Sequence, residues 1–255
     1  MNDILPKYSK VVLEDQILFW MRQSHDSHIC CIIKLDCLID EKRLAKAVRL
    51  TLDVEPVLGS MFVKGLFRQH WKRCDDLDKM DFCRLVILPD EETDVAMFLS
   101  TTEPIDLWNG PQVRVFILRS KTDTLCIKID HVVSDVAGMK DYGYLLASIY
   151  KKLSEDETYS PKLNVTGSRS LKQISRQFNL ADKLKIIRRC LRDLSCFMFP
   201  LKYWLSKLPE HDTSGRMYIF RKLDPKLFKA IKAYSIIHKA TINDILVTAL
   251  FHAFY

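Results

Sequence analysis

The residues best suited to chemistry lie in one short segment, 130–135, with the sequence D-H-V-V-S-D. Apolar and polar side chains alternate over 124–130, which predicts a strand, and His131 continues its apolar face. A histidine at a strand end on a buried face is well placed to be a general base, because an ordinary imidazole is largely neutral at pH 7. A hydrogen-bonded core histidine, with Asp135 only as a helix N-cap, is the competing interpretation from spacing alone.

Arg114 is the candidate ionic partner of the aspartate that follows this histidine. In the expected hairpin, a four-residue loop over 120–123 places Arg114 opposite Ile129, one cross-strand diagonal from His131. A slip of one residue in this register would send Arg114 to the other face of the sheet.

Other kinds of site find little support. His25 and His28 are three residues apart in a polar stretch, where solvated side chains are the better expectation than metal ligands, so we expect no metal site. The cysteines form no C-x-x-C pair, and Cys126 points to the strand face opposite to His131. Neither a phosphate-binding loop nor a dinucleotide-binding fingerprint is present in the sequence.

The elements around this segment alternate between strands and helices. Asp40 is the expected N-cap of one helix, a second is expected over 136–152, and a Thr241–Asp244 capping box begins a third. A shorter helix is expected over 94–100. Apolar runs predict strands over 30–35, 61–67, 83–88, 112–118, 124–130 and 216–223. We therefore predict an α+β fold with a mixed, largely antiparallel sheet flanked by helices.

Length and composition agree with this fold class. The chain has 255 residues, 48% of them hydrophobic and 28% charged, which excludes fibrous, disordered and disulfide-stapled classes. The sequence has no apolar run long enough to span a membrane and no signal-peptide segment at its start. We therefore expect a cytoplasmic protein whose cysteines are reduced.

Positive charge is concentrated in one third of the chain. Residues 162–232 hold 17 Lys or Arg and 5 Asp or Glu, while the whole chain has a net charge of +7. An apolar stripe with 4-3-4-3 spacing runs from Leu180 to Leu194 and predicts an amphipathic helix. Three interpretations stay open: a solvated basic face on a helix that packs on its own protein, a helix that docks on a membrane surface or a partner, and nucleic-acid binding, which no motif supports.

The segment D-H-V-V-S-D-V-A-G, 130–138, resembles the H-H-x-x-x-D-G signature of the condensation-domain and chloramphenicol-acetyltransferase superfamily of thioester-dependent acyltransferases. Three other segments resemble the same superfamily in the same order. They are the first strand-helix unit and its P-x-L turn (Asp40, Leu44, Ala47, Pro56, Leu58), the strand that precedes the signature (110–114), and the helix that begins the second lobe (240–244).

The resemblance implies a role for each residue of the segment. His131 would deprotonate an acceptor hydroxyl or amine, which then attacks an acyl thioester. Asp135, with Arg114 as its partner, and Gly138 would be structural. The co-substrate would be acyl-CoA or a phosphopantetheine thioester, with no permanently bound cofactor, as in alcohol acetyltransferase-like enzymes. In an acyltransferase the basic region could help to recruit CoA phosphates, although a solvated basic face is the better expectation.

Three features depart from the superfamily pattern. Asp130 stands at the first histidine of the signature, and Val136 stands where a glycine follows the aspartate. Superfamily members are roughly twice as long, with two similar lobes, and the D-F-G-W-G-type motif of the second lobe is absent from this sequence. The last helix also runs to Tyr255 without a cap, so we expect a first lobe at 1–170, a basic amphipathic linker at 171–215 and the beginning of a truncated second lobe at 216–255.

Two functional hypotheses follow. The first is an acyltransferase, or its N-terminal half, that brings together a thioester donor and a small-molecule acceptor at His131. The second is a non-catalytic binding or partner subunit of a split or degenerate acyltransferase. In both hypotheses, exposed apolar faces indicate that the chain binds a second-lobe chain or forms a homo-oligomer. A peripheral contact with a membrane is a further alternative.

Overall fold

The computed structural model describes residues 5–22, 28–65, 69–88, 104–165, 169, 175–198 and 223–254. The chain divides into two compact units, Met1–Ser214 and Gly215–Tyr255. The helix expected over 94–100 lies outside the described residues, and so does all but the last residue of the strand expected over 216–223.

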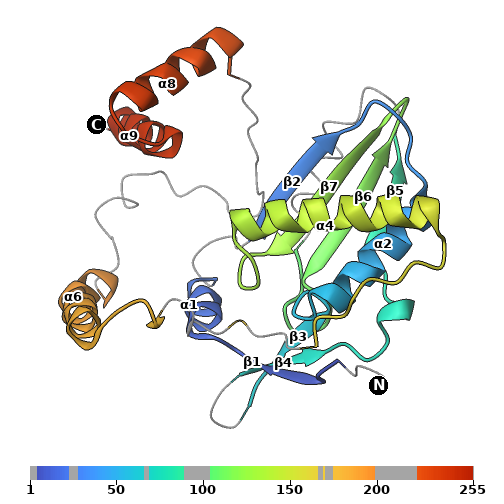
Figure 1. Ribbon diagram of the computed structural model, residues 1–255, viewed down its shortest axis with the longest axis horizontal. Helices are drawn as coiled ribbons and strands as arrows, with labels where there is room; N and C mark the ends of the chain where they lie inside the picture. Colours follow the sequence, from blue (N-terminus) through green and yellow to red (C-terminus); the bar gives the residue numbers. More distant parts are fainter. Residues whose placement is uncertain are drawn as a thin grey trace, which may run out of the picture. The chain divides into compact units, whose positions relative to one another are not determined.

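A four-stranded sheet forms the centre of the first unit (Figure 1). Its strands are β2 (His28–Lys34), β5 (Cys83–Ile87), β6 (Val113–Arg119) and β7 (Asp123–Asp130), in the order β2-β7-β6-β5. The pairs β2–β7 and β6–β7 are antiparallel and the pair β5–β6 is parallel. The prediction of a mixed, largely antiparallel sheet flanked by helices is confirmed.

Helices α2 (Glu41–Val54) and α4 (Val136–Glu155) cover one face of this sheet (Figure 1). Each begins where its sequence predicts. The carboxylate of Asp40 accepts the N–H of Arg43 at 2.9 Å, and that of Asp135 accepts the N–H of Gly138 at 2.7 Å. Their apolar faces bury side chains such as Val48, Leu52 and Leu146 against the sheet, which anchors the loop between β7 and α4.

A smaller sheet consists of β1 (Tyr8–Lys10), β4 (His70–Arg73) and β3 (Ser60–Val63) in the order β1-β4-β3, and η1 (Leu77–Lys79) follows. Of this sheet, the sequence predicted only a strand over 61–67, which β3 confirms in part, whereas β1, β4 and helix α1 (Leu13–Met21) were not predicted. Helix α1 begins at Val12, whose side chain cannot cap a helix, so the usual sequence signal for a helix start is weak here. These elements contribute side chains to the candidate site.

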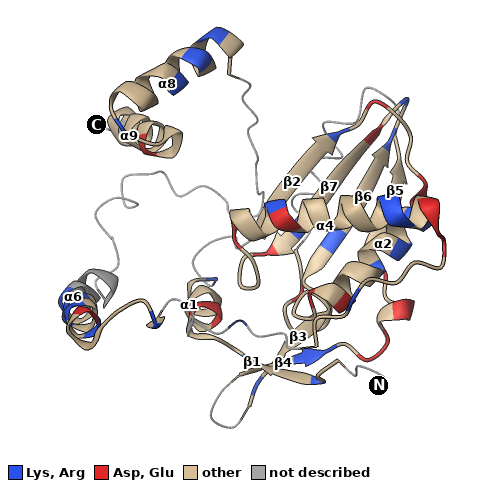
Figure 2. Cartoon of the chain, viewed as in Figure 1, with Lys and Arg blue, Asp and Glu red and all other residues tan. Residues whose placement is uncertain are grey.

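Helix α6 (Leu180–Met198) confirms the helix predicted from the basic region. The side chain of Asn179 caps it by accepting the N–H of Asp182 at 2.9 Å. Basic residues gather on it, as Figure 2 shows in blue. Among the residues that the structure describes, no helix is long and apolar enough to cross a membrane.

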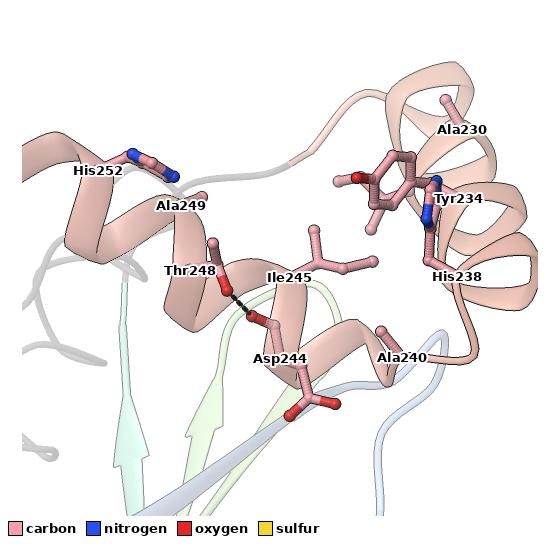
Figure 3. A pocket seen from close by; sticks show the side chains of 10 residues that line it. Ala230, Tyr234, His238, Ala240, Asp244, Ile245, Thr248, Ala249 and His252 are labelled. Carbon is pink, nitrogen blue, oxygen red and sulfur yellow. Dashed lines mark hydrogen bonds between the residues drawn. The ribbon is translucent and has the colours of Figure 1, made fainter.

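The described part of the second unit is a pair of helices, α8 (Pro225–Ile237) and α9 (Ile242–Phe254). Thr241 and Asp244 cap α9 reciprocally, as the capping box predicts, with the N–H of Asp244 donating to the Thr241 hydroxyl at 3.1 Å. Helix α8 was missed, although Asp224 as N-cap and Pro225 in the first turn are a readable signal. A groove of about 640 Å³ lies between the two helices, next to the Tyr234 and His238 rings (Figure 3).

Candidate functional site

His131 lies in the loop that joins β7 to α4, directly after the strand ends at Asp130. The loop is fixed by a turn around the histidine: the Asp130 carboxylate accepts the N–H of Val132 at 2.9 Å, and its carbonyl accepts the N–H of Val133 at 3.1 Å. The side chain of His131 is half-buried. Its Nδ1 is buried and has no hydrogen-bond partner among the residues that the structure describes. A buried ring nitrogen without a partner costs stability, and a catalytic role is one of the explanations for such an atom.

The carboxylate of Asp130 is held by a charged partner from a distant part of the chain. Asp130 is fully buried, and its Oδ2 lies 2.8 Å from Nη1 of Arg22, the residue after α1. Nη2 of the same guanidinium donates to the carbonyl of Ile105 at 2.6 Å. Burial raises the pKa of the Asp130 carboxyl, and the positive charge of Arg22 opposes that rise. The buried pair thus fixes the residue from which the histidine loop starts.

His28 completes this cluster from the neighbouring strand. It is the Cα partner of Asp130 across the β2–β7 pair, and its Nε2 lies 3.8 Å from Oδ2 of that carboxylate. The same Nε2 accepts the backbone N–H of Ile105 at 3.2 Å. Only 3% of the His28 side chain is exposed, so the expectation of a solvated histidine is wrong. Sequence reasoning missed both Arg22 and His28, because only strand pairing and the placement of α1 bring them to Asp130.

The predicted register of the β6–β7 hairpin is wrong by one residue. Arg114 pairs with Lys128 rather than with Ile129, so it lies on the other face of the sheet from the one that was expected. The cause is a shorter loop: Arg119 pairs with Asp123, and Nε of Arg119 donates to that carboxylate at 2.9 Å. The Nη1 of Arg114 donates to backbone carbonyls of its own segment. The observed register therefore gives no support to Arg114 as the partner of Asp135.

Asp135 and Gly138 shape the start of α4. The carboxylate of Asp135 is exposed and caps the helix through the N–H of Gly138, as described above. A Cβ atom at Gly138 would overlap the hydroxyl of Ser134, which donates to the carbonyl of Asp135 at 3.1 Å. A glycine at this position therefore lets the loop turn tightly into the helix.

A second buried carboxylate ties the loop to α1. Asp15 is fully buried and accepts from Nε1 of Trp71 at 2.8 Å and from Nη1 of Arg169 at 2.7 Å. Nη2 of Arg169 donates to the carbonyl of Val133, two residues after the histidine, at 3.0 Å. Burial raises the pKa of the Asp15 carboxyl, and Arg169 opposes the rise. Helix α1 therefore anchors the histidine loop at both of its ends, through Arg22 and Asp15.

A cavity of about 360 Å³ lies beside this loop, between the end of α2 and the first turns of α4. Apolar side chains form much of its wall, with charged groups of Glu55, Asp141 and Arg169 among them. Val133 and Ser134 of the loop line it, whereas His131 does not. The cavity could accept a mainly apolar group with one polar end.

Metal and thiol chemistry gain no support from the described residues. Within the described ranges, no group of three His, Cys, Asp or Glu side chains is arranged to hold a metal ion. His25 of the candidate metal pair lies outside them. Burial raises the pKa of the Cys126 thiol to about 12, so this cysteine stays protonated at neutral pH and is a poor nucleophile.

The chain is similar to known proteins in its structure, but not in its sequence. No protein-family model matches the sequence, and no curated protein matches it. The first condensation domain of the CDA synthetase covers 97% of this chain, with a TM-score of 0.62 and 14% identity. The X-domain from teicoplanin biosynthesis covers 74%, with a TM-score of 0.58 and 15% identity. A mutant starter condensation domain of rhizomide synthetase RzmA in complex with C8-CoA covers 58%, with a TM-score of 0.51 and 14% identity.

The same alignments use only part of each solved structure. They cover 61% of the CDA synthetase domain, 44% of the X-domain and 36% of the rhizomide synthetase domain. The chain thus spans about half the length of the proteins that share its fold.

Proposed function

Because this chain has the condensation-domain fold of the chloramphenicol-acetyltransferase-like superfamily, we propose that it is an acyltransferase or the N-terminal half of one. It moves an acyl group from a CoA or carrier-protein thioester to a hydroxyl or an amine. The observation that carries the proposal is His131, whose buried Nδ1 has no partner in the described part of the chain and which sits on a loop fixed from both ends.

In the proposed reaction His131 is the general base. It takes the proton of the acceptor hydroxyl or amine while the acceptor oxygen or nitrogen attacks the thioester carbonyl. The new C–O or C–N bond forms, the C–S bond then breaks, and the leaving thiolate takes the proton from the imidazolium. A positioned base contributes typically 10² to 10⁴ in rate.

Asp130 and Arg22 have a positioning role in this proposal. The superfamily signature has a histidine where this chain has Asp130, and the Arg22 guanidinium neutralises the carboxylate that replaces it. The carboxylate also closes the turn around His131. Asp135 and Gly138 shape the same loop from its other end. Arg114, which pairs with Lys128, has no role in the proposed reaction.

The thioester donor is the next element of the proposal. A solved structure of this fold contains C8-CoA, which supports acyl-CoA as the donor class, with a phosphopantetheine thioester as the chemically equivalent form. No permanently bound cofactor is needed, because the thioester itself supplies the activated acyl group. We place the lobe at 1–170, the basic linker at 171–215 and the start of a second lobe at 216–255, in a cytoplasmic protein.

A second candidate is a non-catalytic binding or partner subunit. Large apolar side chains of the second unit are exposed, among them Ile236, Ile237, Leu250 and Phe251. Such a surface calls for cover by a second-lobe chain or by another copy of this chain. The chain also spans only part of the solved condensation domains, which likewise supports a partner chain.

The test is product formation from a defined set of substrates. The purified chain is incubated with acyl-CoAs from acetyl to dodecanoyl and a mixture of small alcohols and amines, and products are identified by mass spectrometry. We expect an acylated product that falls by about 10² or more in His131→Asn. His70→Asn, which changes an exposed histidine on β4, is the matched control and keeps full activity. Acyl-CoA binding without any product, unchanged by His131→Asn, would favour the second candidate.

A further inference from the structure

Helix α6 carries an exposed apolar stripe over the part of the helix whose side chains the structure describes, 180–192. The stripe consists of Leu180, Leu184, Ile187 and Leu191, which are 79%, 66%, 54% and 66% exposed. At about 100° per residue these four side chains fall within about 60° of one another around the helix. Large aliphatic side chains that stay in water are unfavourable, so a stripe of this kind indicates a partner surface.

Positive charge borders the stripe on both sides. Lys183 and Arg188 lie about 70° to either side of its centre, by the same helical geometry. Lys185, Arg189 and Arg192 add further positive charge on the exposed face beyond Arg188, where a cavity is lined by basic side chains. Figure 2 shows this concentration of blue residues on α6. The only acidic residue in the described side chains of α6 is Asp182, which lies 4.0 Å from Lys185.

We propose that α6 binds the surface of an anionic lipid bilayer, with its apolar stripe inserted at the level of the headgroups. Charge complementarity selects this occupant: the stripe faces the acyl chains while Lys183 and Arg188 reach lipid phosphates from its two borders. A nucleic acid would match the positive charge but would leave four large aliphatic side chains in water. The helix lies in the interface and does not cross it, consistent with its polar face.

Membrane binding by α6 does not depend on the proposed acyl transfer. If both hold, the acyl transfer takes place at a membrane surface. The test is co-sedimentation of the full chain with vesicles of phosphatidylcholine alone or with about 30% phosphatidylserine. We expect binding to the anionic vesicles that exceeds binding to neutral ones by tenfold or more and weakens as salt is raised. Each basic residue near an anionic surface accounts for about fivefold in affinity, so Lys183→Glu with Arg188→Glu should weaken binding by about 25-fold or more.

Two further variants make the result specific to α6. Leu184→Ser with Ile187→Ser changes exposed side chains only and should weaken binding to anionic vesicles at least tenfold without unfolding the chain. Lys151→Glu with Lys152→Glu reverses two exposed charges on α4 and should leave vesicle binding unchanged.

Three outcomes would overturn the proposal. One is equal sedimentation with neutral and anionic vesicles. Another is an effect of the α4 variant as large as that of the α6 charge variant. The third is a chain that ignores vesicles but forms dimers by light scattering, or binds single-stranded RNA, in a manner that the α6 variants abolish, because the stripe would then serve a protein or a nucleic acid.

Discussion

Replacing Arg22 by methionine removes the charge that faces the buried carboxylate of Asp130. Asp130 is fully buried, the Arg22 side chain is 23% exposed, and their charged atoms are 2.8 Å apart. Removing one partner of a buried ion pair costs about 3–5 kcal/mol, because a buried charge loses its compensation. Since the arginine is partly exposed and the carboxyl can take up a proton, we expect a loss near the lower limit, about 3 kcal/mol of unfolding free energy at about pH 7.5.

The loss should depend on pH with a definite sign. Burial raises the pKa of Asp130 and Arg22 opposes that rise, so the variant has a still higher pKa at this carboxyl. A carboxyl whose folded pKa exceeds its unfolded value adds stability that is complete below the unfolded pKa and is lost as pH rises through the folded pKa. Arg22→Met should therefore be less destabilising at about pH 5 than at about pH 7.5.

Equilibrium urea denaturation, followed by tryptophan fluorescence, measures this effect, since Trp71 is fully buried in the native chain. In an Asp130→Asn background the same arginine change should cost less than about 1.5 kcal/mol, because no buried charge is left uncompensated. Lys152→Met, which breaks the exposed pair with Glu155, is the control and should cost less than about 1 kcal/mol. A loss from Arg22→Met that matches the control, or that is equal at both pH values, would refute the reasoning.

Other parts of the structure give three further expectations. Leu52→Ala removes a fully buried side chain on α2 and should lower the unfolding free energy by about 2–5 kcal/mol in the same urea assay; a loss below about 1 kcal/mol would contradict the described core. Gly138→Ala should destabilise the chain because Ser134 occupies the space, yet in a Ser134→Ala background it should stabilise by about 0.5–1 kcal/mol through helix propensity; the same sign in both backgrounds would argue against the contact. Alkylation with N-ethylmaleimide, mapped by mass spectrometry, should modify the exposed Cys37 long before the buried Cys126, whose pKa burial raises to about 12; equal rates would show that the sheet face around Cys126 is open.

Local signals predicted most of the elements that frame the candidate site. Asp40, Asp135 and the Thr241–Asp244 box each cap a helix where the sequence indicates, because a capping side chain acts within three residues of itself. Alternation identified β7 and the strand-end position of His131, since the pleat sets a period of two. These features depend on neighbouring residues only, so spacing reveals them.

The contacts that the sequence did not reveal are long-range. Arg22 and Asp130 are far apart in the chain, as are Asp15 and its partner Trp71, and both pairs depend on where α1 packs. The register of the β6–β7 hairpin failed for a smaller reason: the Arg119–Asp123 pair shortens the loop by one residue, and one residue reverses every side chain of a strand. Arg119 and Asp123 are visible in the sequence as an oppositely charged pair that flanks a short loop. Pairing them would have given the correct register and placed Arg114 opposite Lys128.

The central claim is that His131 is the general base of an acyl transfer. The most direct measurement compares kcat and KM of the chain and of His131→Asn for the best donor and acceptor found in the substrate screen, with the fold of the variant checked by its urea midpoint. We expect kcat to fall by about 10² to 10⁴ and the KM for the thioester to change by less than about threefold, because a base acts in the transition state and not in donor binding. A kcat that stays within about threefold of that of the unaltered chain would contradict the assignment of His131.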